Sequence, residues 1–341
     1  MQEISNRRTE PLPKSSPPLF VVGCGRSGTT MFRLMLDSHP DLAVPGESHF
    51  IPDLYRHRGR YTTTGLLDAR RLASDIMRTL HVRLWEVPRI AVWRRLESLE
   101  HPEFADVVGA VFAAYADHHG KKRWADKTPI YVLWMPLLSN LFPDARFIHL
   151  IRDGRDVALS YLSVPWGPST VWKAARKWRR DVTAGRESGH ALGPSRYMEI
   201  RYEDLVARPK EILKATCSFA NIRFDDRMLD YHNGASDRIE WRSGKEFHST
   251  ATKPPAPGAR DWRTQMPDSH LKIFEAVAGG LLKELGYERR YPSVPLGLRV
   301  QAAIRSAAFT VWTTGSRVKK SLSEATGRSK PASIDRAMDG A

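Results

Sequence analysis

A short segment near the start of the chain, residues 23–30, carries the side chains best suited to chemistry. It combines a permanent cation with hydroxyl donors and with the glycines that a tight turn requires. In chain order its residues are Gly23, Cys24, Gly25, Arg26, Ser27, Gly28, Thr29 and Thr30. An arginine binds phosphate through charged hydrogen bonds, and a glycine lets a ligand approach the backbone closely. The segment therefore predicts an anion-binding loop.

The flanking elements place this loop between a strand and a helix. Residues Leu19–Val22 form a short apolar run of β-branched and aromatic type, which is typical of a buried strand that enters a tight turn. From Thr29 to Asp37 apolar residues recur at three- and four-residue intervals, which predicts a helix. The first N–H groups of a helix lack partners inside it, and the macrodipole is positive there, so this position attracts phosphate.

The spacing of Gly23 and Gly28 matches a nucleotide phosphate loop, but Thr29 replaces the lysine that such a loop requires. A kinase or NTPase uses this lysine, together with Mg²⁺, to neutralise the β- and γ-phosphates. Arg26 inside the loop suits a donor with one phosphate and a less charged transferable group. The missing lysine argues against a Mg²⁺-dependent nucleotide kinase, which we keep as an alternative.

The sequence Gly-Arg-Ser-Gly-Thr-Thr, followed by a helix, resembles the 5′-phosphosulfate loop of sulfotransferases that use 3′-phosphoadenosine 5′-phosphosulfate (PAPS). The resemblance runs from Leu19 to about Pro292, and the loop is similar to that of the tyrosylprotein type. It implies PAPS as the co-substrate and no metal. The loop residues that it assigns to cofactor binding are Arg26, Ser27, Gly28, Thr29 and Thr30.

The resemblance also implies three catalytic residues. Gly46-Glu47 matches the Gly-Glu that supplies the catalytic base in tyrosylprotein sulfotransferases and many bacterial relatives, with His49 as the next candidate for the base. Lys127, which is followed by Thr-Pro, matches a lysine that touches the sulfuryl oxygens. Arg26 and Lys127 would together stabilise the charge that develops as the sulfuryl bond breaks.

A second segment suited to binding an anion follows Arg146–Ile151, the clearest strand of the chain. We call this segment and the loop at residues 23–30 the two anchors. Arg152 at the strand end and Ser160 eight residues later resemble the arginine and serine that reach the 3′-phosphate of PAPS in this family. A guanidinium grips a phosphate with two parallel hydrogen bonds and stays charged at any working pH. Together with the loop at residues 23–30 and Lys127, this segment predicts a site for PAPS.

Two later segments resemble nucleotide-binding parts of the family. Tyr202 lies in the sequence Arg-Tyr-Glu-Asp-Leu, where the resemblance places it against the nucleotide. Residues 243–263 have little periodicity and many Gly, Pro, Lys and Arg residues, and they resemble a basic lid that closes over the 3′-phosphate. The residues that match this lid are Ser249, Lys253, Arg260 and Trp262.

The composition limits the partners of the chain. Its 341 residues carry a formal net charge of +15, from 53 Lys and Arg against 38 Asp and Glu, which indicates an anionic partner. No zinc-finger spacing or RNA-recognition consensus accompanies this charge, so we expect no nucleic acid and keep a non-catalytic polyanion-binding protein as a second alternative. Cys24 and Cys217 are neither a disulfide framework nor a metal set, which favours a reducing, cytoplasmic location.

We expect one large domain with a different segment at each end. Residues 1–18 are rich in Pro, Ser and charge and predict a disordered leader, and residues 19–292 predict the sulfotransferase domain. Residues 293–341 predict a basic amphipathic helix and tail, in which 296–320 meets a membrane surface, a partner or its own domain. A homodimer stays open, and no stretch has the length of a transmembrane helix.

Alternating strand and helix signals, together with the resemblance, predict an α/β fold. We expect a P-loop-like three-layer sandwich with a central parallel sheet flanked by helices, and with ligands at the carboxyl ends of the strands. Residues 197–205 predict a strand that ends in a turn. The further helices are expected over residues 66–80, 104–115, 130–141, 169–187, 209–220, 226–233 and 271–285.

The expected reaction is transfer of a sulfuryl group from PAPS to an acceptor hydroxyl. The sequence leaves carbohydrate, lipid, phenol and tyrosine open as acceptors. In this family the segment between the first and second strands shapes the acceptor pocket, which here corresponds to residues 55–118. Its basic and aromatic candidates are Arg56, Arg58, Arg60 and Tyr61.

Overall fold

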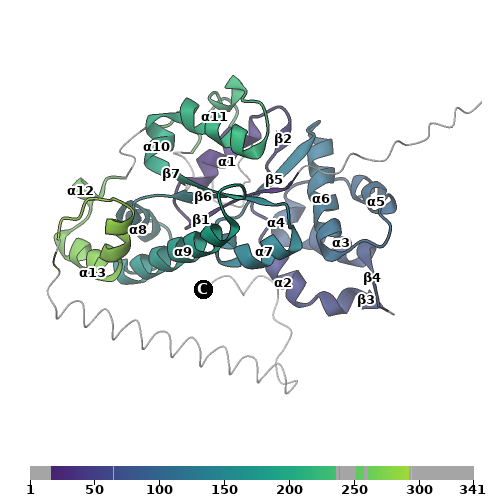
Figure 1. The fold of residues 1–341 in the computed structure, drawn as a ribbon, viewed down its shortest axis with the longest axis horizontal. Coiled ribbons are helices and arrows are strands. Elements are labelled where there is room, and N and C mark those ends of the chain that lie inside the picture. The colour runs from purple at the N-terminus through teal and green to yellow at the C-terminus, as the bar shows by residue number, and fades with distance from the viewer. Residues whose placement is uncertain are drawn as a thin grey trace, which may run out of the picture.

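The computed structural model describes residues 17–63, 65–235, 238, 251–256, 260–291 and 293. Within them the chain folds around a five-stranded parallel sheet in the order β2-β5-β1-β6-β7 (Figure 1). The strands are β1 (Leu19–Gly23), β2 (Leu42–Ala43), β5 (Arg123–Lys127), β6 (Arg146–Ile151) and β7 (Tyr197–Arg201).

The central strand β1 is buried along its whole length, as expected for a parallel strand that is covered on both faces. Its side chains alternate between two cores because successive residues of a strand point to opposite faces. Phe20 and Val22 join one hydrophobic cluster, whereas Leu19 and Val21 join another. The predicted run of four apolar residues therefore forms the centre of the molecule.

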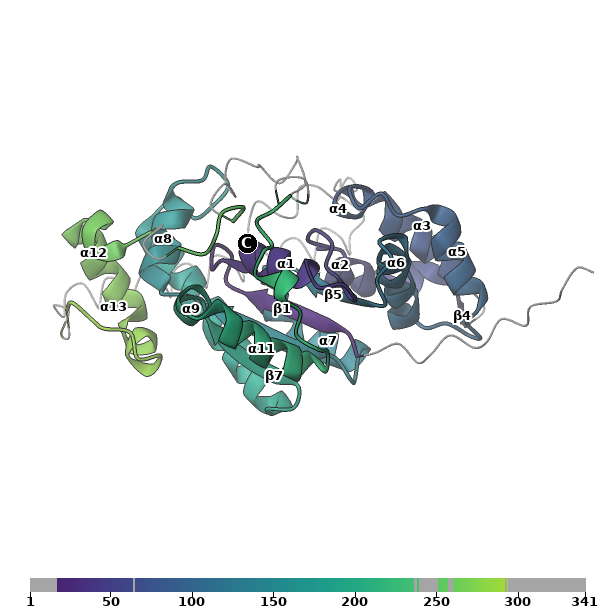
Figure 2. The ribbon, with the colours of Figure 1, turned by 90° about the horizontal axis from the view of Figure 1, so that it is seen from above.

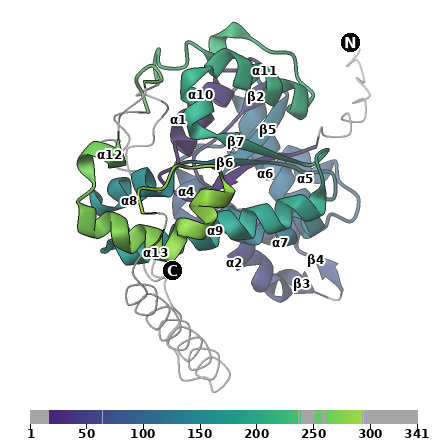
Figure 3. The same ribbon diagram turned by 60° about the vertical axis from the view of Figure 1, so that its left-hand side comes forward.

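Different helices cover the two faces of the sheet (Figures 1 and 3). One face carries α1 (Thr29–Asp37), α10 (Tyr202–Ala207) and α11 (Pro209–Ala220). The other carries η2 (Pro129–Trp134), α7 (Met135–Leu141) and α9 (Val171–Leu192). A third cluster around Trp178 joins α9 to α8 (Gly154–Leu162), α12 (Trp262–Gln265) and α13 (Asp268–Glu284). The predicted α/β sandwich with a central parallel sheet is confirmed.

A mostly helical segment between β2 and β5 forms one end of the molecule, opposite α12 and α13 (Figure 2). Its interior is a cluster of apolar and aromatic side chains, in which the rings of Phe112 and Trp124 stack at 4.5 Å. Its elements are α2 (Ile51–Arg56), η1 (Arg58–Tyr61), β3 (Thr62–Thr63), β4 (Leu66–Leu67), α3 (Ala69–Arg78), α4 (Leu80–Arg83), α5 (Arg89–Glu97) and α6 (Phe104–His118).

The helix expected over residues 66–80 was wrong at both ends. Leu66 and Leu67 pair with β3 in an antiparallel hairpin, and Gly65 has a φ of 84° that a helix does not allow. Asp68 then starts α3, because its side chain accepts a hydrogen bond from the Arg71 backbone N–H at 2.9 Å. At the other end Thr79 separates α3 from α4.

Residues 130–141 form two elements rather than one helix. Pro136 has no N–H and is tolerated only in a first helical turn, so α7 begins at Met135 and the preceding residues form η2. Two other expectations also change: Tyr202 starts α10 rather than a turn, and residues 226–233 contain only η3 (Asp226–Met228). The helices expected over 104–115, 169–187, 209–220 and 271–285 are present with bounds shifted by a few residues.

Some expectations concern residues that the structure does not describe. Residues 1–16 of the predicted leader (1–18) belong to this group, and so do residues 294–341 of the predicted basic C-terminal segment, with the stretch 296–320. These expectations, the homodimer and the cytoplasmic location stay predictions. In the part of the chain that is described, no helix is both long and apolar enough to cross a membrane.

Candidate active site

The predicted site residues gather at one edge of the sheet, where the parallel strands end. Gly23 ends β1 and leads into the loop before α1, and Lys127 is the last residue of β5. Arg152 follows β6, and Tyr202 follows β7. The strand registers set these ends side by side, as the carboxyl ends of parallel strands are in other open α/β sheets.

The loop between β1 and α1 is tight, and its surroundings require its glycines. Gly28 has a φ of 91°, and a Cβ atom there would lie 2.4 Å from the ring of Tyr202. A Cβ atom on Gly25 would lie 2.5 Å from the Tyr161 hydroxyl. Between them Arg26 has a φ of 69°, a left-handed conformation that costs a residue with a side chain about 1–2 kcal/mol. Such strain is characteristic of a ligand-binding loop.

Two buried donors of this site have no hydrogen-bond partner among the described residues. They are Oγ of Ser27, which is fully buried, and Nε of Arg152, a residue that is 7% exposed. Burying a polar group without a partner costs about 1–3 kcal/mol, so native proteins rarely keep one without a reason. A phosphate-bearing ligand would give both donors an acceptor, and the residues present therefore fit such a ligand.

Arg152 is held by an aromatic ring and a carboxylate. Its guanidinium lies 4.3 Å from the centroid of the Tyr202 ring, and its Nη2 lies 3.6 Å from Oδ2 of Asp156. Burial raises the pKa of Asp156 to about 6, although the charge of Arg152 lowers it. The other oxygen of Asp156 accepts a hydrogen bond from the Trp262 backbone N–H at 2.9 Å. This one carboxylate thus ties the predicted lid to the arginine.

Arg26 connects the loop to the second anchor. Its Nε donates a hydrogen bond to Oγ of Ser160 at 3.0 Å. Burial lowers the pKa of Arg26, and the positive charges of Arg260 and Arg152 lower it further. Arg260 itself donates to Oγ of Ser163, also at 3.0 Å. Three guanidinium groups that repel one another form a positive site, which an anion would neutralise.

Glu47 and Lys127 form an ion pair at the same edge, with 2.5 Å between Oε1 and Nζ. The second oxygen of Glu47, Oε2, lies 2.8 Å from Nε2 of His49. Burial alone would raise the pKa of Glu47, but Lys127 and His49 together hold it well below its usual range. Lys127 is 3% exposed, whereas the side chain of Glu47 is 32% exposed. The carboxylate therefore keeps a face that a substrate can reach.

Besides Arg260, three lid residues were predicted, and each has a different outcome. Ser249 lies outside the described residues. Lys253 is exposed, its carbonyl accepts a hydrogen bond from the Tyr231 hydroxyl, and no bond within the described residues brings its ammonium group to the strand ends. Trp262 is buried, with the guanidinium of Arg155 3.5 Å from its ring centroid, so it packs the lid onto α8.

Sequence reasoning missed a group of buried polar residues behind Glu47. Each member is only 1% exposed. The members are Ser48, Asp126, Thr128 and Tyr131. A signal was available, because Ser48 and Asp126 directly adjoin Glu47 and Lys127 in the sequence. It also missed His81 of α4, whose ring lies 4.5 Å from that of His49, since no pattern relates two histidines so far apart in the chain.

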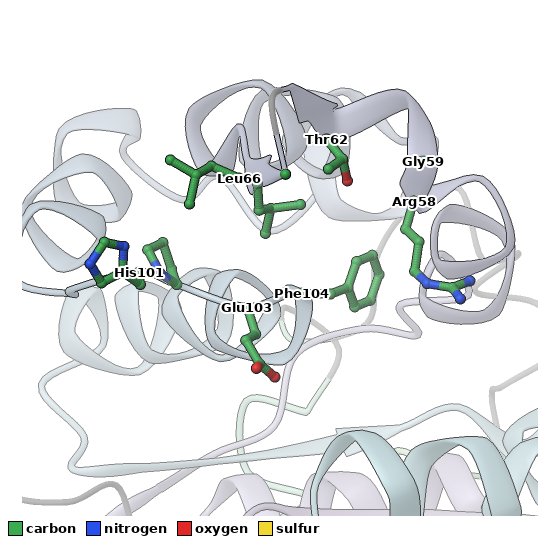
Figure 4. Close-up of a pocket in the computed structure, with 10 residues that line it drawn as sticks. Arg58, Gly59, Thr62, Leu66, His101, Glu103 and Phe104 are labelled. Atoms are coloured by element: carbon green, nitrogen blue, oxygen red, sulfur yellow. The ribbon is translucent and has the colours of Figure 1, made fainter.

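A hollow of about 770 Å³ lies in the helical segment between β2 and β5 (Figure 4). Leu66 of β4 faces it from one side and Phe104 of α6 from the other. Of the predicted acceptor candidates, Arg58 lines it, whereas Tyr61 is buried and its hydroxyl donates to Asp75 at 3.0 Å. We call the residues gathered at the strand ends the strand-end cluster: residues 23–30, Glu47, Lys127, Arg152, Ser160 and Tyr202. The hollow shares no lining residue with this cluster, so we place the chemistry in the cluster.

The tight loop leads to a prediction about Gly28. Replacing it by alanine is expected to lower the free energy of unfolding by at least about 1–2 kcal/mol, because the new Cβ needs a left-handed conformation and displaces the Tyr202 ring. Urea unfolding measures the change. Gly59→Ala is the matched control, since nothing lies within 4 Å of a Cβ there. Equal stability of the two variants would contradict the steric argument.

Comparison with known proteins shows the family of the chain. A family model described as the sulfotransferase family matches residues 17–226. The protein-tyrosine sulfotransferase of Drosophila melanogaster is 25% identical over 295 residues, which are 83% of this chain and 54% of that protein. Nodulation protein NoeE of Sinorhizobium fredii is 28% identical over 312 residues, covering 83% of this chain and 68% of NoeE.

The fold has a solved counterpart in the sulfotransferase domain of the Synechococcus PCC 7002 olefin synthase. The TM-score is 0.56 at 24% identity, and the alignment covers 81% of this chain and 98% of that domain. The shared architecture and the family match over residues 17–226 agree with the motifs at the strand ends. The chain belongs to the sulfotransferase family and is a PAPS-dependent enzyme that transfers a sulfuryl group to an acceptor hydroxyl.

Proposed function

We propose that the strand-end cluster is the place where this enzyme binds PAPS and carries out the transfer. The observation that carries the proposal is the pair of buried donors without partners, Oγ of Ser27 and Nε of Arg152, which lie at the two anchors of the cluster. The phosphosulfate end would lie against the loop, where Arg26 and the N–H groups at the start of α1 supply positive charge. The 3′-phosphate would lie against Arg152 and Ser160.

The remaining binding residues follow from their neighbours. Tyr202 packs against both Arg152 and Gly28, so its ring would border the nucleotide between the two phosphate positions. Arg260 would close the 3′ side from the lid, because its side chain already reaches Ser163 just beyond α8. Thr29 and Thr30 complete the loop as the first residues of α1.

In the reaction, PAPS supplies the sulfuryl group. Glu47 accepts the proton of the acceptor hydroxyl, since its carboxylate is ionised and partly exposed. Lys127 has three N–H donors, so it can hold Glu47 with one and face the developing charge on the sulfuryl oxygens with the others. As negative charge grows on the sulfuryl oxygens, Lys127 interacts with them as well as with Glu47. Lys127 then lowers the pKa of Glu47 less, so Glu47 becomes a stronger base when it takes the acceptor proton.

We propose that this transfer needs no metal. Arg26, Lys127 and Arg152 already place three positive charges at the strand ends, where the 5′-phosphosulfate and the 3′-phosphate of PAPS must be neutralised. Turnover in the presence of a chelator is therefore expected to equal turnover without it. A loss of activity that Mg²⁺ or another divalent cation restores would contradict this part of the proposal.

Tyrosine is the acceptor to test first, because relatives of this chain are named protein-tyrosine sulfotransferases. Carbohydrate, lipid and phenol hydroxyls form the rest of the test panel. The kinase alternative would need the missing loop lysine, and the polyanion-binding alternative would not need a carboxylate paired with Lys127 at the same site.

The decisive experiment incubates the protein with PAPS labelled at sulfur and with each acceptor class in turn. Label is expected to appear on a hydroxyl-bearing product, with one equivalent of adenosine 3′,5′-bisphosphate released for each label transferred. Titrating the same protein with ATP and with the bisphosphate supplies the control. Binding of ATP in preference to the bisphosphate, without transfer of label, would overturn the proposal.

A further inference from the structure

The turn that carries Glu47 is fastened to β5 by a second, buried contact. Ser48 is 1% exposed, and its Oγ donates a hydrogen bond to Oδ2 of Asp126. The Ser48 backbone N–H donates to Oγ1 of Thr128 at 2.9 Å. The hydroxyl of Tyr131 lies 2.9 Å from Oγ of Ser48 and accepts a hydrogen bond from the Ile51 N–H at 3.0 Å. These bonds enclose the turn from residue 48 to residue 51.

The two contacts between the turn and β5 involve adjacent residues on each side. Glu47 pairs with Lys127, and the next residue, Ser48, bonds to Asp126, the residue before Lys127. Asp126 and Lys127 point to opposite sides of β5, because side chains alternate along a strand. In the first contact the Glu47 side chain is partly exposed and the Lys127 ammonium lies at the end of a long, flexible side chain. In the second contact both side chains, Ser48 and Asp126, are short and buried. Of these two contacts, the Ser48 contact therefore restrains the backbone of the turn more directly.

The turn needs such a fastening because its backbone is strained. His49 has a φ of 58°, in the left-handed region that costs a residue with a side chain about 1–2 kcal/mol. Asp126 is costly as well, since burial raises its pKa to about 6 and its Oδ1 has no hydrogen-bond partner among the described residues. Strain and a buried carboxylate at the same place are typical of a site kept for function rather than for stability.

We propose that Ser48 and Asp126 are positioning residues, whose buried hydrogen bond holds the Glu47 carboxylate beside Lys127, in the position from which it takes the proton of the acceptor hydroxyl. Neither side chain reaches the partly exposed face of Glu47, so both act through it and not on the acceptor. A misplacement of about 1 Å in a reacting group can cost on the order of 10²-fold in rate. This inference rests on the proposed role of Glu47 as the base.

The test compares Ser48→Ala with Thr216→Val. Thr216 is also buried, but among the described residues its hydroxyl bonds only to the Ile212 carbonyl of its own helix, so its loss is expected to affect stability alone. Ser48→Ala is expected to lower kcat roughly 10- to 100-fold while the KM for the acceptor and the affinity for adenosine 3′,5′-bisphosphate change less than about threefold. Tyr131→Phe, which keeps the ring, is expected to act in the same direction and serves if Ser48→Ala fails to fold.

A double-mutant cycle with Glu47→Gln separates positioning from general support of the fold. If Ser48 acts through Glu47, adding Ser48→Ala to Glu47→Gln is expected to lower the remaining kcat by less than about threefold. Equal losses in both backgrounds, or a kcat of Ser48→Ala and Tyr131→Phe no lower than that of Thr216→Val, would overturn the inference. Absence of sulfuryl transfer by the unaltered protein would instead overturn the proposed function itself.

Discussion

Replacing Glu47 by glutamine is expected to lower turnover roughly 10²–10⁴-fold, which is the range that general acid–base catalysis contributes. Glutamine keeps the shape of the side chain and an oxygen that can accept from Lys127, but it cannot take the proton of the acceptor. The affinity for adenosine 3′,5′-bisphosphate is expected to stay nearly unchanged, because the donors assigned to the nucleotide are Ser27, Arg26 and Arg152. Single-turnover sulfation and a bisphosphate titration measure the two quantities.

The same substitution changes the charge around Lys127, so its effect on stability must be measured beside its effect on rate. Lys127 is 3% exposed, and removing its carboxylate partner leaves a buried cation with a neutral acceptor. The melting temperature is therefore expected to fall. Glu97→Gln is the matched control, since Glu97 pairs with Arg70 on an exposed surface. Near-normal turnover of folded Glu47→Gln would contradict the assignment and move the base to His49.

The part of the site that lies on regular elements was predictable from the sequence. The loop after β1 and Arg152 each follow a run of strand-forming residues, Lys127 ends β5, and parallel strands must end at one edge. The residue types at these positions, a cation among hydroxyls and an arginine before a helix, can be recognised in the sequence without knowing how the segments pack. The same reasoning explains why α1 was predicted with correct bounds from its apolar spacing.

The sequence did not predict contacts that depend on how distant segments pack. The ring contact between His49 and His81 and the hydrogen bond from Trp262 to Asp156 each join residues that no local pattern relates. Local rules also failed where a competing rule was stronger, as when Pro136 divided an expected helix in two. Ser48 was overlooked for another reason, because a small polar residue between two candidate bases attracts no attention until its burial is known.

Replacing Arg152 by alanine is expected to remove most of the preference for adenosine 3′,5′-bisphosphate over AMP. The two nucleotides differ only in the 3′-phosphate, which we assign to Arg152 and Ser160. Losing one charged hydrogen-bonded contact costs roughly 2–3 kcal/mol, which corresponds to about 30- to 150-fold in affinity. Calorimetric titration of both nucleotides against both proteins gives the four affinities that define the preference.

The control for this variant must remove an arginine without touching the cluster. Arg208 serves because it is exposed and pairs with Asp204 and Glu211 on the surface, so Arg208→Ala is expected to leave both affinities unchanged. Arg152→Lys adds a second comparison: a lysine keeps the charge but not the paired donors of a guanidinium, and part of the preference is expected to be lost. If the unaltered protein binds the bisphosphate and AMP equally, or if Arg152→Ala weakens both to the same extent, Arg152 does not recognise the 3′-phosphate. The positive charge at this strand end would then belong to the general field of the site, and the specificity for PAPS would have to come from the lid.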